Sequence, residues 1–214
     1  MDIQHQPDSA ADTRRLRIAF IVTVAFTLLL WAVKLAEYLG DLDLTRFGIY
    51  PRRLDGLVGV LCAPFVHGSF AHLFANTTPI IVIGTMLFYV YPRAAKVLLP
   101  TVYLGGGVAV WLFAREAYHI GASGIAFGML FFVLSSGVLR WERRAIAISL
   151  VIFFLYGGMI LGTIPDARGI SFESHLSGAL IGIVLAFLLR HSDPGPPRKQ
   201  YSWESEDEEL DDCG

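Results

Sequence analysis

Six apolar stretches separated by short polar segments dominate the sequence. An α-helix needs about 17–25 residues to cross about 30 Å of hydrocarbon, and only the last stretch falls short of that length. The pattern therefore predicts an all-α protein, a polytopic membrane bundle of six transmembrane helices. The expected spans are residues 18–39, 73–91, 97–114, 122–139, 145–164 and 174–189.

The composition agrees with a protein embedded in a membrane. Hydrophobic residues make up 54% of the 214 residues and charged residues only 17%, whereas an ordinary soluble domain is about 45–50% apolar. The mean hydropathy is +0.55. These values exclude an ordinary soluble domain. The sequence contains no phosphate-binding glycine loop and no nucleic-acid motif, so the expected partner is the lipid bilayer and not nucleic acid.

Basic residues predict the orientation of the spans. They cluster before span one, between spans two and three, between spans four and five, and after span six: Arg14, Arg15, Arg17, Arg93, Lys96, Arg140, Arg143, Arg144, Arg190, Arg198 and Lys199. The positive-inside rule then places both termini in the cytoplasm, with the spans in the cell membrane. Residues 40–72 (loop one), 115–121 and 165–172 fall on the opposite side. Three arginines in loop one weaken this charge difference.

The two ends of the chain differ in composition from the membrane region. Residues 1–14 are expected to form a polar cytoplasmic tail, residues 15–191 the six-helix membrane domain, and residues 192–214 an acidic, disordered cytoplasmic tail that cannot build a core.

Cys62 and Cys213 lie on opposite sides of the membrane in this topology, so no disulfide is expected between them. Loop one is apolar enough to lie on or partly in the bilayer.

Glycines four residues apart predict which spans touch. Gly124 and Gly128 lie in span four, and Gly178 and Gly182 lie in span six. Lipid offers no hydrophobic drive for helix association, so small residues at this spacing let two backbones approach closely. Spans four and six are therefore expected to pack against each other. Because both spans run in the same direction, their first residues should meet.

The residues at the starts of these spans form a candidate catalytic set. Ser123 opens span four and His175 opens span six, so Ser123 could act as a nucleophile and His175 as its base. His72 and Asn76 share one face of span two and could donate hydrogen bonds to an oxyanion, as could the backbone N–H of Ser123. Each residue taken alone has a simpler reading, since serine is a common helix cap and histidine and asparagine often join helices.

Two other kinds of site fit the sequence less well. A zinc site is disfavoured because His67 and His72 are separated by about 140° around a helix and no Glu lies between them. A proton-coupled transporter is disfavoured because spans two to six contain no Asp or Glu that could relay protons. No metal and no cofactor are therefore expected.

Three motifs together resemble the rhomboid family of intramembrane serine proteases. They are His67-(four residues)-His72-(three residues)-Asn76 in span two, Gly121-Ala122-Ser123-Gly124 opening span four, and His175-Leu176-Ser177-Gly178-(three residues)-Gly182 in span six. Their order and spacing are those of the family, and the resemblance covers roughly residues 15–191. The short GxSG motif is weak alone, whereas the combination is specific.

The resemblance implies a serine endopeptidase that cleaves the transmembrane segments of single-span or multi-span membrane proteins, with an active site opening to the non-cytoplasmic side. Ser123 would be the nucleophile and His175 the base of a dyad without a carboxylate. Asn76 and His72 would form the oxyanion hole together with Ser123. His67 would fill a supporting position, and Gly121 would allow close backbone approach.

The sequence also departs from the family pattern. Many bacterial members have Tyr four residues after the serine, where this chain has Phe127, which keeps the ring face and loses the hydroxyl. A Trp-Arg pair of loop one is absent, and Arg52 and Arg53 are a loose counterpart. Six spans without a seventh match the basic bacterial form. The alternative function is a weakly active or silent relative that binds membrane clients.

Overall fold

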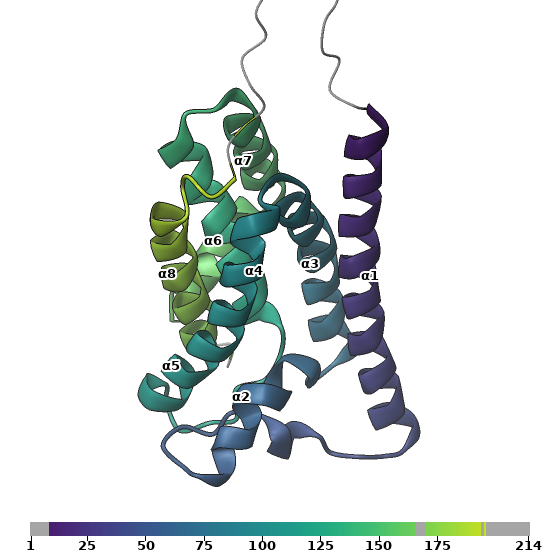
Figure 1. Ribbon diagram of the computed structural model, residues 1–214. Coiled ribbons are helices and arrows are strands. Elements are labelled where there is room, and N and C mark those ends of the chain that lie inside the picture. The colour runs from purple at the N-terminus through teal and green to yellow at the C-terminus, as the bar shows by residue number, and fades with distance from the viewer. Residues whose placement is uncertain (1–8, 166–169, 194, 196–214) are drawn as a thin grey trace, which may run out of the picture.

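The computed structural model describes residues 9–165, 170–193 and 195 (Figure 1). Its long helices coincide with the six predicted spans. Four spans are single helices: α1 (Ser9–Leu39), α3 (Phe70–Val90), α6 (Ser123–Arg140) and α8 (Phe172–Leu188). The third span is a continuous helix made of α4 (Pro92–Pro100), the π-helical turn η4 (Thr101–Gly105) and α5 (Gly106–Phe113). The fifth span consists of α7 (Arg143–Tyr156) and the 3-10 helix η5 (Gly157–Thr163). The predicted all-α membrane bundle is confirmed.

Five of these elements are long and apolar enough to cross a membrane, and α8, with 17 residues, is shorter. The prediction that only the last span is short therefore holds. Helix α1 begins at Ser9, before the predicted start of span one at residue 18, and it includes Arg14, Arg15 and Arg17. A helix continues beyond the apolar span wherever the residues have good helix propensity, and Ala, Arg and Leu dominate this segment.

Helix α6 lies at the centre of the bundle, with α3, α7 and α8 packed around it (Figure 1). Its apolar side chains are buried on several faces, including Ala126, Leu130, Phe132 and Val133. By contrast, most of the apolar side chains of α7 are exposed at the edge of the bundle, where lipid would cover them. The most enclosed helix is thus the one that begins with Ser123.

Helices α6 and α8 approach each other at the predicted glycines. A Cβ atom added at Gly178 would lie 2.1 Å from the carbonyl oxygen of Gly124, and one added at Gly182 would lie 2.4 Å from that of Gly128. Both distances are far below any real contact, so only glycine permits this separation. The predicted packing of spans four and six is confirmed, and it brings the starts of both helices together.

This contact predicts a large effect of a single methyl group. Gly178→Ala should force α6 and α8 apart and lower the stability of the protein by about 1–3 kcal/mol, because the obstructing atoms are backbone and cannot rotate away. Thermal unfolding in detergent measures the loss. Gly158→Ala is the matched control, since a Cβ there has no neighbour within 4 Å. Equal stability of the two variants would contradict this description of the interface.

Loop one packs against the bundle through short helical turns. These are η1 (Thr45–Phe47), η2 (Asp55–Val58), α2 (Gly59–Cys62) and η3 (Ala63–Phe65). Ile49, Val60 and Ala63 form a small buried cluster with Val110 and Ala114 of the α5 end. Arg52 donates from Nη1 to the Ala114 carbonyl at 2.8 Å, and Trp111 Nε1 donates to the Arg53 carbonyl at 2.8 Å. Loop one is thereby fastened to the end of α5.

The chain end after α8 also packs on the bundle. The two carboxylate oxygens of Asp193 accept from the backbone N–H groups of Arg93 and Ala94, each at 2.9 Å, where α4 begins. A carboxylate there satisfies free N–H groups and the positive end of the helix dipole. Asp193 therefore packs against the bundle, within the first residues of the predicted C-terminal tail. Cys213 and most of that tail lie outside the described residues.

Candidate active site

Ser123 and His175 meet where α6 and α8 begin. Ser123 Oγ lies 2.8 Å from His175 Nε2, and both residues are buried. His175 Nδ1 lies 2.8 Å from the carbonyl oxygen of Gly162. A carbonyl only accepts, so Nδ1 carries the ring proton, and Nε2 of the neutral ring faces the serine hydroxyl with its lone pair. The hydroxyl therefore donates to the histidine, which is the polarity that a general base needs.

Two groups hold the His175 ring in this orientation. The Phe127 ring stacks on it, with ring centroids 4.0 Å apart and planes 5° apart. On η5, a Cβ at Gly162 would lie 2.9 Å from the Phe127 ring and 3.2 Å from His175 Nδ1, so a side chain there would push against both rings. Sequence reasoning singled out Phe127 and missed Gly162, because a backbone carbonyl leaves no motif.

Gly121 allows the chain to reach the serine. Its φ of +105° is a conformation that L side chains rarely adopt, and an added Cβ would lie 2.8 Å from the His72 ring. Its N–H donates to the Ala63 carbonyl at 2.9 Å, which ties the segment before α6 to loop one. The close backbone approach expected at this position is present.

Asn76 and His72 lie on α3 beside this segment. The Asn76 amide donates to the backbone oxygen of His72 at 3.2 Å, and its nitrogen lies 3.7 Å from the Cβ position at Gly121. An amide has two N–H groups, so one is left to meet a ligand. The N–H of His72 is capped by Ser69 Oγ at 3.0 Å, which fixes the first turn of α3. Both side chains thus converge on the backbone that carries Ser123.

His67 supports the start of α6 from loop one. It is 1% exposed, and its Nε2 accepts from the Ala122 N–H at 3.4 Å. Burial, with a smaller contribution from the neighbouring His72, lowers the pKa of His67 to about 4. The ring is therefore neutral at physiological pH, as an acceptor of this bond must be. Ala122 is the N-cap of α6, and its side chain forms no capping hydrogen bond. His67 therefore satisfies the N–H of Ala122 at this helix start.

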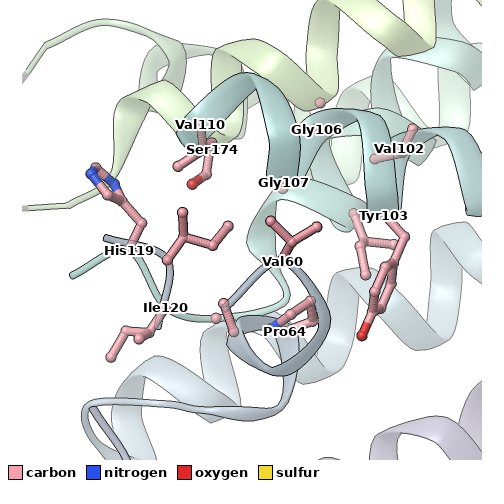
Figure 2. A pocket seen from close by; sticks show the side chains of 16 residues that line it. Val60, Pro64, Val102, Tyr103, Gly106, Gly107, Val110, His119, Ile120 and Ser174 are labelled. Carbon is pink, nitrogen blue, oxygen red and sulfur yellow. The ribbon is translucent and has the colours of Figure 1, made fainter. Parts of the chain in front are cut away.

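Two cavities lie near the starts of α6 and α8. One of about 270 Å³ lies between α6, η5 and α8, beside the His175 ring, and is lined mainly by apolar side chains, among them Phe127, Met159, Leu161, Ile164, Ile170 and Phe172. The other, of about 40 Å³, lies beside the start of α6, between loop one, η4–α5 and α8 (Figure 2). Among the described residues, no three His, Cys, Asp or Glu side chains gather closely enough to hold a metal ion.

Comparison with known proteins identifies the family. The rhomboid domain model matches residues 55–192, which include all three motifs. An uncharacterized protein of Mycobacterium tuberculosis is 37% identical over 175 residues, covering 78% of this chain and 73% of its own length. An uncharacterized protein of Mycobacterium leprae is 33% identical over 199 residues, covering 88% and 78%.

A plant protein is also similar. RHOMBOID-like protein 2 of Arabidopsis thaliana is 30% identical over 151 residues, which cover 68% of this chain and 44% of the plant protein. The matched region of the domain model takes in α3 to α8, the helices that carry Asn76, Ser123 and His175. This multi-pass membrane protein therefore belongs to the rhomboid family.

Proposed function

We propose that this protein is an intramembrane serine endopeptidase that cleaves other membrane proteins with a Ser123–His175 dyad. The observation that carries the proposal is the 2.8 Å bond between Ser123 Oγ and His175 Nε2, with the proton on Nδ1 held by the Gly162 carbonyl. A serine hydroxyl is a weak nucleophile until a base takes its proton. The orientation of the His175 ring supports its role as that base.

In the first step, Ser123 Oγ attacks the carbonyl carbon of the scissile peptide bond while His175 Nε2 takes the hydroxyl proton. The oxygen of the tetrahedral intermediate becomes negative and accepts hydrogen bonds from Asn76, His72 and the Ser123 N–H. His175 then gives its proton to the leaving nitrogen as the C–N bond breaks, leaving an acyl-enzyme. Water attacks this ester with His175 again acting as base, which frees Ser123 and the second product.

The Gly162 carbonyl replaces the carboxylate of a three-residue triad in this scheme. It accepts from Nδ1–H in both the neutral and the protonated ring, so it fixes the tautomer throughout the cycle. A neutral carbonyl stabilises the imidazolium less than a carboxylate does, and it costs less to bury in a membrane. The stacked Phe127 ring restricts the remaining rotation.

The basic residues support a site that opens to the non-cytoplasmic side, with both termini in the cytoplasm. In Figure 1 the start of α1 and the junction of α3 with α4 lie at the upper end of the molecule, and loop one lies at the lower end. Arg14, Arg15, Arg17 and Arg93 belong to the upper end. The segment preceding Ser123 is bonded to loop one at the lower end, through Ile49, Ala63 and His67.

The test is cleavage of a single-span substrate by the purified protein in proteoliposomes. A substrate with a Pro or Gly near the cleavage site should be cut faster than one with an all-Leu helix, because a hydrogen-bonded helix does not present its carbonyls to a nucleophile. Gel analysis of both substrates over time gives the two rates. Equal rates would contradict local unwinding of the substrate. No product from either, with folded protein, would favour a client-binding role instead.

A further inference from the structure

His119 is a buried histidine that the proposed mechanism does not use. It lies in the segment between α5 and α6, is 2% exposed, and forms two hydrogen bonds through its ring. Its Nε2 lies 2.9 Å from the carbonyl oxygen of Arg115, and its Nδ1 lies 2.6 Å from Ser171 Oγ. Both ring nitrogens are therefore satisfied within the protein.

The partners determine where the protons lie. The Arg115 carbonyl only accepts, so Nε2 of His119 carries the proton and Nδ1 of the neutral ring accepts from the Ser171 hydroxyl. The Ser171 oxygen in turn lies 2.7 Å from Ser174 Oγ and accepts from the Ser174 N–H at 3.3 Å. Ser171 is thus the N-cap of α8, and His119 orients that cap.

This bond joins the two segments that deliver the dyad. His119 precedes Ser123 by four residues, and Ser171 precedes His175 by four residues. On the His119 side the backbone is already fixed, because His119 and Ile49 exchange two hydrogen bonds of 2.9 Å. The bond therefore connects the start of α8 to the rigid assembly of loop one and the segment before α6. His119 and Ser174 also lie on the same small cavity (Figure 2).

A second link between the same segments is more exposed. Arg115 Nη1 lies 3.3 Å from Glu173 Oε1, and Arg115 Nη2 donates to the Ile170 carbonyl at 2.9 Å. The Arg115 side chain is 41% exposed, so solvent screens much of its attraction to Glu173. The bond between His119 and Ser171 is the less exposed of the two links, because the His119 side chain is buried and Ser171 is half-buried.

We propose that His119 and Ser171 are positioning residues, whose hydrogen bond sets the start of α8 against the start of α6 and so holds His175 Nε2 within reach of Ser123. This inference rests on the proposed protease function. A dyad without a carboxylate depends on such positioning, because a backbone carbonyl and a stacked ring orient its histidine. A displacement of about 1 Å costs about 100-fold in rate when reacting groups must be aligned.

Two substitutions of His119 separate its two hydrogen bonds. In His119→Asn the side-chain oxygen takes the place of Nδ1 and still accepts from Ser171. In His119→Gln the longer side chain reaches the place of Nε2, so it keeps the Arg115 bond and loses Ser171. We expect His119→Gln and Ser171→Ala to lower kcat about 10- to 100-fold with KM nearly unchanged. His119→Asn should stay within about threefold of the wild type in kcat.

The measurements are kcat and KM for a single-span substrate in proteoliposomes, and thermal unfolding of the same full-length variants in detergent. The double variant His119→Gln/Ser171→Ala should be no worse than Ser171→Ala alone in both measurements, because Ser171→Ala already removes the bond to His119 together with the cap of α8. A double variant that is worse than Ser171→Ala by the full loss of His119→Gln would overturn the bond. Equal kcat for His119→Gln and the wild type, or a loss in His119→Asn as large as in His119→Gln, would overturn the positioning role.

The failure of this inference is distinguishable from the failure of the proposed function. A wild-type protein that cleaves no substrate overturns the protease and, with it, the positioning of a dyad. A wild-type protein that cleaves, with His119→Gln and Ser171→Ala as active as the wild type, overturns only the role of His119 and Ser171.

Discussion

Replacement of either dyad residue should abolish proteolysis. Ser123→Ala removes the nucleophile and His175→Ala removes its base. Each should lower kcat at least about 10⁴-fold for a single-span substrate, because the nucleophile and its base act as one unit and neither works without the other. The double variant should be no slower than either single variant. Gel analysis of cleavage by purified protein measures the rates, and a serine-reactive fluorophosphonate should label the wild type and not Ser123→Ala.

Ser135→Ala is the matched control for these variants, since Ser135 lies further along the same helix α6, away from the dyad. It should cleave at the wild-type rate. Product from all variants, including Ser123→Ala, would indicate a contaminating protease. Normal cleavage by His175→Ala alone would mean that another group deprotonates the serine, in contradiction to the 2.8 Å bond as the catalytic contact.

Truncation of Asn76 should produce the next largest loss. Asn76→Ala removes a buried amide that lies beside Gly121, where a negative oxygen next to Ser123 would form. Loss of one such donor typically costs about 10²- to 10³-fold in kcat, because the interaction is stronger in the transition state than with the bound substrate. We expect that loss with little change in KM, measured by steady-state kinetics on the same substrate.

Thr78→Ala on the same helix is the control, because Thr78 is exposed and lies two residues beyond Asn76. It should leave both kinetic parameters unchanged. If Asn76→Ala instead raised KM and preserved kcat, Asn76 would bind substrate and not the oxyanion. Thermal unfolding of Asn76→Ala is needed beside the kinetics, since the lost bond to the His72 carbonyl lies in the first turns of α3.

Hydropathy predicted the helices because a membrane imposes a simple length requirement. A bilayer demands about 20 consecutive apolar residues in each crossing helix. Such a run is visible in the local sequence without knowledge of the tertiary structure. The helix ends were less predictable, as α1 shows by beginning at Ser9. Beyond the hydrocarbon, helix ends depend on propensity and on partners such as Asp193, which is distant in sequence from the helix α4 that it caps.

The candidate site was predictable where it consists of side chains at fixed spacings. Ser123, His175, Asn76 and His72 were expected to meet because they lie at the starts of spans that share one side of the membrane. The glycines of α6 and α8 indicated that these two helices pack together. Glycine is informative here because a backbone contact at 2.1 Å from a Cβ position excludes every other residue. Phe127 was expected on the Ser123 face, and its ring stacks on His175.

The sequence alone thus determined the helical spans, the family motifs and the pairing of α6 with α8. Only the tertiary structure decided which nitrogen of His175 faces Ser123, since a backbone carbonyl at Gly162 sets the tautomer. It alone joined His119 to Ser171 and packed loop one on the end of α5. These features depend on where separate segments of the chain meet in space. The local sequence around a backbone carbonyl or a single loop histidine does not indicate which distant residue will contact it.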